Sequence, residues 1–223
     1  MWCIGDLDAE YVRKMEDVLA VYEKPYQAAE PVICLDEKPV SLHAEVRGPI
    51  PARPGRIAMR DSVYKRCGTA NVFCAVEPKA GRHFTFPTPD RSGFEFARVA
   101  VSLALAYPAA KTIHLVMDNL NIHRRKALAD AFGEEMAAQV RDRFTVHYTP
   151  THGSWLNQAE IEIGIFSRQC LGKRRISSLA ALRTETKAWN RRMNRNRVKI
   201  QWRFDRKAAR RKFGYKCKHF KQS

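Results

Sequence analysis

The alternation of apolar and polar positions predicts a helix and then a buried strand at the start of the chain. Apolar side chains recur at helical spacing from Leu7 to Tyr22, with Asp6 or Asp8 as the capping residue. The segment VICLDEK then places four consecutive apolar residues directly before Asp36, which is typical of a strand buried on both faces. We therefore expect this strand to end at the acid.

The next part of the chain predicts an irregular segment, an antiparallel meander and a helix. Residues 47–56 hold too many prolines and glycines for regular structure. The stretches IAMRDSVYKR, ANVFCAVEP and RHFTF are predicted to be strands. A helix is expected from Ser92 to Tyr107. Its apolar face is predicted to consist of Phe94, Ala97, Val101 and Leu105.

The pattern then changes to strand, helix and strand, which indicates a parallel crossover unit. TIHLVMDN is a second apolar strand and ends in Asp118; residues 123–140 form an amphipathic helix, and residues 143–150 a third strand. Strand ends of an α/β sheet meet at one edge, where catalytic groups collect. Asp36 and Asp118 are therefore expected to form a carboxylate pair.

A turn and an acidic helix follow the third strand, in HYTPTHGSWLNQAEIEIGIFSR. The helix is expected to begin near Ser154. Its buried stripe is predicted to consist of Leu156, Ala159, Ile163, Phe166 and Cys170. At 100° per residue, Glu160 and Glu162 fall on opposite edges of that stripe, so only one of them faces a shared site. Geometry alone does not choose between them. A further helix is expected from Ser177.

Three carboxylates gathered at one place repel one another unless divalent cations lie between them. Carboxylate oxygens suit Mg²⁺ or Mn²⁺, and two such ions about 4 Å apart promote phosphodiester displacement. The alternatives are that each Asp accepts a turn hydrogen bond and that Glu160 is the solvated flank of a helix. The histidines lack ligand spacing and are expected to be packing or surface residues. They include His123, His147 and His152.

The charge distribution indicates a polyanionic partner. The net charge is +17, yet residues 1–167 hold 20 basic and 21 acidic side chains, and residues 168–223 hold 20 and 2. Such a surplus favours nucleic acid over an acidic membrane, with a merely solubilising basic tail as the alternative. The candidate nucleic-acid-binding residues are Lys173, Arg174, Arg175, Arg191, Arg192 and Arg195.

Other features narrow the class of protein. The six cysteines form no C-x-x-C pair, which argues against a zinc site and against a disulfide framework. No apolar stretch reaches the roughly 18 residues of a membrane span, and the first residues lack a signal-peptide pattern. The 223 residues suffice for one main domain. We expect a cytoplasmic protein.

The motifs VICLDEK, LVMDNLNIH and HYTPTHGSWLNQAEIE resemble, in order and context, the three acidic motifs of transposases of the mariner superfamily, in its bacterial insertion-sequence branch. The likeness runs from about Trp2 to Tyr215. It implies a ribonuclease-H-like α/β fold, with three antiparallel strands, then two parallel ones, and helices on both faces. Carried over by position, the catalytic and metal-binding acids are Asp36, Asp118 and Glu160. The family's third acid comes three residues after the Asn, which selects Glu160.

The resemblance also implies a reaction and its partners. These are DNA cleavage and strand transfer with two Mg²⁺ ions, or Mn²⁺ as a substitute, on element ends and TA target sites. A homodimer associated with the bacterial nucleoid is expected. The competing functions are another two-metal nuclease of the same fold, such as a junction resolvase, and a catalytically silent DNA-binding remnant.

The expected division of the chain is an N-terminal helix over residues 1–30, a catalytic core over 31–175 and a basic helical extension over 176–223. The residues before Asp36 are too few for the helix-turn-helix domain that usually precedes this core. We therefore expect a truncated remnant, a core expressed alone, or one half of a split reading frame. In the last case a separate polypeptide supplies end recognition.

Overall fold

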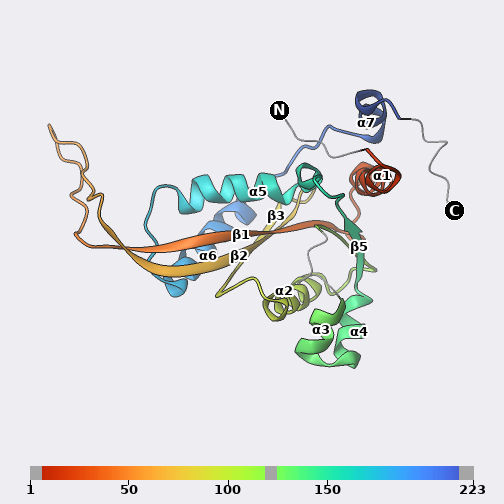
Figure 1. The fold of residues 1–223 in the computed structure, drawn as a ribbon, viewed down its shortest axis with the longest axis horizontal. Helices are drawn as coiled ribbons and strands as arrows, with labels where there is room; N and C mark the ends of the chain where they lie inside the picture. The colour runs from red at the N-terminus through yellow and green to blue at the C-terminus, as the bar shows by residue number, and fades with distance from the viewer. Residues whose placement is uncertain (1–6, 119–124, 216–223) are drawn as a thin grey trace.

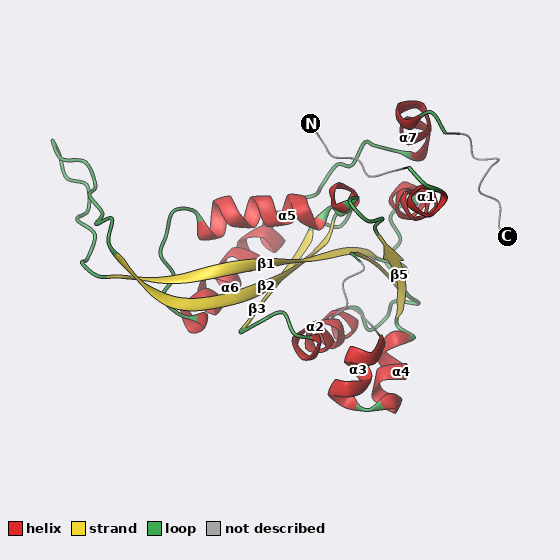
Figure 2. Ribbon diagram, in the orientation of Figure 1, coloured by secondary structure: helices red, strands yellow, loops and turns green. Residues whose placement is uncertain are grey.

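The computed structural model, which describes residues 7–118 and 125–215, contains a mixed five-stranded sheet with helices on both faces (Figures 1 and 2). The spatial order is β3-β2-β1-β4-β5. The strands are β1 (Val32–Glu45), β2 (Tyr64–Glu77), β3 (Arg82–Thr88), β4 (Ile113–Met117) and β5 (Phe144–Tyr148). The first three pair antiparallel, and β1, β4 and β5 pair parallel. This confirms the expected ribonuclease-H-like arrangement.

The helices largely begin where capping residues predict. Asp8, Ser92 and Ser178 each accept a backbone N–H of the helix that follows. The helices are α1 (Ala9–Glu23), α2 (Gly93–Ala106), α3 (Arg125–Phe132), α4 (Glu134–Arg141), α5 (Ala159–Phe166), α6 (Leu179–Asn196) and α7 (Arg206–Phe213), with a 3-10 turn η2 (Ser154–Leu156) and a π-helical turn η3 (Ser167–Leu171). The single helix predicted over 123–140 is two helices, because Gly133 adopts φ +82° between them. Residues 123 and 124 lie outside the described residues.

Two strand predictions were wrong. β1 does not end at Asp36 but continues to Glu45, and residues 57–63 belong to a loop rather than to a strand. The reason is cross-strand pairing, because β2 supplies hydrogen-bond partners along β1 as far as Tyr64. The two strands form a long ribbon, and the loop over 46–63 projects from its tip (Figure 1).

The predicted buried face of α2 was also wrong in part. Phe94 and Leu105 are 53% and 74% exposed, whereas Ala97 is buried as expected. The other buried apolar residues of this helix are Phe96, Val99, Ala100 and Leu103. A helix that is apolar on most sides has no single stripe, so its contacts with the sheet and with α3 and α4 select the buried face.

Strand alternation divides the core into two layers. Cys34 and Val116 point to the face covered by α1 and α7, whereas Ile33 and Leu115 pack against α2 on the other face. Helices α5 and α6 complete the first face, over β1 and β2. No helix within residues 7–118 and 125–215 has the length and apolar character required to cross a membrane.

The turn between β2 and β3 generates a first prediction. Gly81 has φ +65°, and a Cβ there would lie 2.6 Å from the backbone carbon and oxygen of Arg197. Gly81→Ala is therefore expected to lower the free energy of unfolding by about 2–4 kcal/mol, through backbone strain and overpacking together. Urea unfolding followed by circular dichroism measures the loss.

The matched control is Gly214→Ala, because Gly214 has a similar φ of +69° but nothing within 4 Å of the added Cβ. It isolates the cost of the left-handed conformation, about 1 kcal/mol. Equal losses in the two variants would show that the close approach to Arg197 does not constrain this turn.

Candidate active site

The two predicted aspartates lie side by side on one face of the sheet. In the parallel pairing of β1 with β4, Cys34 is opposite Val116, so the same register carried two residues further sets Asp36 beside Asp118. Side chains two positions apart in a strand point to the same face, so Asp36 lies on the face of Cys34 and Asp118 on the face of Val116. Helix α5 covers that face. The structure therefore brings the two acids together, although Asp36 lies within its strand and not at its end.

The turn before α5 is attached directly to the strand that carries Asp36. The side-chain amide of buried Asn157 donates to the carbonyl oxygen of Leu35 at 2.8 Å, and its Oδ1 accepts the N–H of Ala159 at 3.1 Å. Tyr22 of α1 donates its hydroxyl proton to the carbonyl oxygen of Leu156 at 2.8 Å. These bonds set the start of α5, and with it Glu160, over β1.

Glu160 and Glu162 have different environments. Glu160 is exposed, whereas the side chain of Glu162 is fully buried against His83, whose Nδ1 lies 2.8 and 2.9 Å from the two carboxylate oxygens. The Nε2 of His83 lies 2.8 Å from the carbonyl oxygen of Val198. Glu162 thus joins α5 to β3. The spacing predicted it at an edge of the buried stripe, whereas the structure buries it completely.

The electrostatics of Asp36 show which acids share its surroundings. Burial, together with the negative charges of Glu37, Glu160 and Asp118, raises the pKa of Asp36 to about 7. The backbone N–H of Glu37, which donates to Asp36 at 2.8 Å, partly opposes this rise of the pKa. Glu160 and Asp118 therefore lie close enough to Asp36 to act on it.

The chemistry of this donor set fits a divalent cation. Carboxylate oxygens are the ligands that Mg²⁺ and Mn²⁺ prefer, and a cation would offset the repulsion that raises the pKa of Asp36. Within the described residues, however, no three His, Cys, Asp or Glu side chains are gathered closely enough to hold a metal ion. The three acids face a common region without converging on one point.

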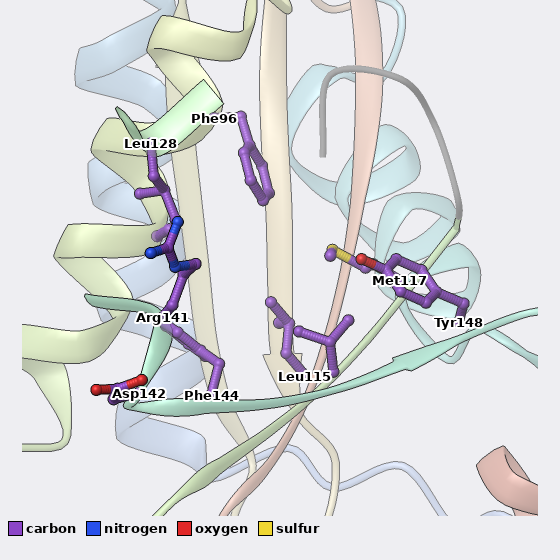
Figure 3. A pocket seen from close by; sticks show the side chains of 10 residues that line it. Phe96, Leu115, Met117, Leu128, Arg141, Asp142, Phe144 and Tyr148 are labelled. Atoms are coloured by element: carbon purple, nitrogen blue, oxygen red, sulfur yellow. The ribbon is translucent and has the colours of Figure 1, made fainter. Parts of the chain in front are cut away.

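A cavity of about 700 Å³ lies on the opposite face of the sheet, between β4, β5 and helices α2 to α4 (Figure 3). Leu115 and Met117 line it from β4, with Phe96 of α2 and Phe144 of β5. Because Met117 directly precedes Asp118, their side chains point to opposite faces. This apolar cavity is separate from the three carboxylates.

The six candidate nucleic-acid-binding residues have different environments. Arg175 has a 13% exposed side chain, pairs with Glu45 at 2.5 Å and donates to carbonyls of residues 61–63. Arg174 pairs with Glu185 at 2.6 Å. Lys173, Arg191, Arg192 and Arg195 are exposed.

The predicted histidines divide between packing and surface positions. His147 is buried and bonded to Asp17 at 2.7 Å and to His114 at 3.0 Å. Burial lowers the pKa of His114, with Lys24 nearby. His152 is exposed, and His123 lies outside the described residues.

Sequence reasoning missed the role of Asn157. The segment WLNQAE indicated that an Asn precedes the helix, but its bond to Leu35 joins residues 122 positions apart. No periodic pattern of apolar residues in the sequence could predict this hydrogen bond.

Asn157 generates a second prediction. Asn157→Ala leaves the buried carbonyl of Leu35 without this donor and is expected to cost about 1–3 kcal/mol of unfolding free energy. Thermal and urea unfolding measure it. Thr151→Ala, at an exposed position of the same turn, should change stability by less than about 0.5 kcal/mol. Comparable losses in both variants would contradict the assigned anchoring bond.

The raised pKa of Asp36 generates a third prediction. The folded protein binds this proton more tightly than the unfolded chain, so the group lowers stability as pH rises from about 4 to about 7, and the loss persists above that range. Asp36→Asn should therefore stabilise the metal-free protein at pH 8, by at most about 4 kcal/mol, and have little effect near pH 4.

Urea unfolding in EDTA at both pH values measures the difference between this variant and the parent. Asn keeps an oxygen that accepts the N–H of Glu37, so the comparison isolates the charge. A variant less stable than the parent at pH 8 would contradict the unfavourable burial of the carboxylate.

Several solved structures resemble this fold. The Mos1 mariner paired end complex with Mn matches with a TM-score of 0.54 and 14% identity, over 88% of this chain and 61% of that chain. A pre-cleavage Mos1 transpososome matches at 0.55 and 12%, over 91% and 67%. The catalytic domain of Mos1 mariner transposase matches at 0.54 and 10%, over 90% and 100%. This chain therefore spans about three fifths of the first of these proteins.

Sequence comparison gives the family. No curated protein sequence matches the chain. The family model described as DDE superfamily endonuclease matches residues 31–183, which begin just before β1, end within α6 and include Asp36, Asp118 and Glu160. Because that match covers more than half of the chain, and the fold is that of the Mos1 catalytic domain, this protein belongs to the DDE superfamily endonuclease family.

Proposed function

We propose that this chain is the catalytic part of an insertion-sequence transposase, which cuts DNA and joins it to a new site at Asp36, Asp118 and Glu160. The proposal is supported by the hydrogen bond from Asn157 to Leu35, which holds the first turn of α5 and Glu160 over the strand that carries Asp36. The charges of Glu160 and Asp118 also help to raise the pKa of Asp36. These acids come from three separate segments, β1, the end of β4 and α5. Among the described residues, neither Asp36 nor Glu160 forms an ion pair, so their charges are available to a ligand.

Divalent cations, when bound, would supply electrostatic stabilisation of the attacking and leaving oxygens of a phosphodiester. Asp36 and Asp118 would hold them from the sheet, and Glu160 from the first turn of α5. Asn157 keeps α5 over β1, while the buried contact of Glu162 with His83 fixes the other side of the helix. The chain's own residues thus orient the three carboxylates.

The basic last quarter of the chain supports DNA as the substrate, because it favours a polyanion. The Mos1 structures include a strand transfer complex and paired-end complexes with Mg and Mn, which supports the same reaction here. The finer proposals are element ends and TA target sites as substrates, a dimer as the active form, and Mg²⁺ or Mn²⁺ as the cofactor.

The fourth prediction tests the site by cleavage. Supercoiled plasmid should become nicked or linear with Mg²⁺ or Mn²⁺ and stay intact in EDTA. Asp118→Asn and Glu160→Gln should each reduce the rate at least about a hundredfold, because each removes a ligand that positions the charge-stabilising cations. Agarose gel time courses measure the rate.

The matched control is Glu135→Gln, which removes an exposed carboxylate of α4, on the other face of the sheet, that forms no ion pair among the described residues. It should cut like the parent. As a second readout, Mn²⁺ should raise the thermal midpoint of the parent more than that of Asp118→Asn. If the folded parent binds DNA but cuts nothing with either metal, the silent DNA-binding alternative replaces the proposal.

Cleavage by itself does not separate a transposase from another two-metal nuclease of the same fold. An assay with a labelled duplex carrying a free 3′ hydroxyl and an unlabelled target plasmid makes that distinction. Transfer of label into the plasmid supports the transposase. Structure-selective cutting without any transfer supports the resolvase-like nuclease.

A further inference from the structure

A second basic site lies on the outer side of α6, apart from the three carboxylates. Four cationic side chains recur at intervals of four residues along this helix, so they follow one side of it. They are Arg183, Lys187, Arg191 and Arg195. The first and last of them are twelve residue steps apart, about 18 Å along the helix axis.

These four cations, which we call the α6 stripe, are exposed and not neutralised by the protein. None of them takes part in an ion pair among the described residues, and Glu185, the single acid of α6, pairs instead with Arg174. Like charges four residues apart destabilise a helix by roughly 0.2–0.5 kcal/mol per pair. An anionic ligand would remove that repulsion.

The α6 stripe borders a groove of about 570 Å³ between α6 and β3. Thr85 and Pro87 line it from β3, and Asn190 from α6. The groove is held in shape by Asn194, whose amide exchanges two hydrogen bonds of 2.8 Å with the backbone of His83. The site is therefore built from two elements.

Two polar atoms in this groove lack a partner. Thr85 is 8% exposed, and its Oγ1 is buried without a hydrogen bond among the described residues. The same holds for Oδ1 of Asn190. Both atoms lie just below the surface of the groove, so its wall is polar on the β3 side and on the α6 side.

We infer that this groove binds the sugar-phosphate backbone of DNA. Phosphate oxygens accept hydrogen bonds from the guanidinium and ammonium groups of the α6 stripe. The length of the α6 stripe favours a polymer over a single anion. At 3.4 Å per nucleotide along the helix axis, about 18 Å corresponds to about five base pairs.

The DNA segment bound in this groove is not the segment that contains the phosphodiester being cut. Asp36 pairs with Cys74 and Cys74 with Thr85, so Thr85 lies two strands away, about 10 Å across the sheet. Helix α5 packs over β1 and β2, whereas α6 packs on β3. The groove between α6 and β3 is therefore separated from the three carboxylates by these helices. The contact is a backbone contact that carries no sequence information directly.

This inference rests on the proposed function only in taking DNA as the partner. The test measures binding of a fluorescent 30-base-pair duplex in EDTA, by anisotropy over a series of salt concentrations. The groove variant replaces all four cations of the α6 stripe with Gln. Its affinity should fall at least about tenfold, and its salt slope should shrink by up to about 3.6, since each of the four phosphate contacts contributes about 0.9.

The matched control replaces four other exposed cations that form no described ion pair, so that the net charge falls equally. They are Lys199, Arg203, Lys207 and Arg211, each changed to Gln. A clearly smaller effect supports the groove. An equal or larger effect overturns the inference, because it shows that overall charge alone attracts DNA.

Three further outcomes test this inference, and the last two separate it from the proposed function. If inorganic phosphate at millimolar concentration binds the parent but not the groove variant, while the two bind DNA equally well, the groove is a small-anion site and the inference fails. If the parent cuts plasmid and the groove variant binds and cuts equally well, the inference fails while the function stands. If the parent binds DNA through the groove but does not cut it, the inference stands and the proposed transposase activity fails.

Discussion

The hydrogen bond from Asn157 to the carbonyl oxygen of Leu35 couples the helix that carries Glu160 to the strand that carries Asp36. Without such a tie, mutual repulsion would move an exposed carboxylate on the first turn of a helix away from two others. The bond is buried and joins the main chain directly beside Asp36, so it sets the position of the helix rather than of one flexible side chain. Tyr22 and Glu162 hold the same helix from two other sides.

Apolar packing of the core offsets the unfavourable free energy of holding the three carboxylates close together. The sheet is covered on one face by α1, α5, α6 and α7 and on the other by α2 to α4, so its central strands are buried on both sides. That burial stabilises a fold in which Asp36 is unfavourable as an anion. A carboxylate kept at such a cost is typical of a functional site, because a cation or substrate restores the favourable charge balance.

The basic residues of the last quarter serve two physical purposes. Arg206 and Arg210 of α7 pair with Glu23 and Glu16 of α1, at 2.7 Å in each case, and hold the end of the chain on the core. Arg175 likewise pairs with Glu45 at the base of the projecting loop over 46–63. The α6 stripe makes no such pairs among the described residues, so its charge is available to a partner. Net charge alone does not reveal this division, because it counts paired and unpaired cations alike.

The sequence by itself determined the element order, most helix starts and the three acidic segments, because capping residues and apolar runs are local properties. It chose Glu160 over Glu162 only through the resemblance to a family, whereas the structure gives a physical reason: Glu162 is buried against His83. The extension of β1 past Asp36, the buried face of α2 and the anchor at Asn157 were not predicted. Each depends on a partner distant in the chain, and only the tertiary structure decides which distant groups meet.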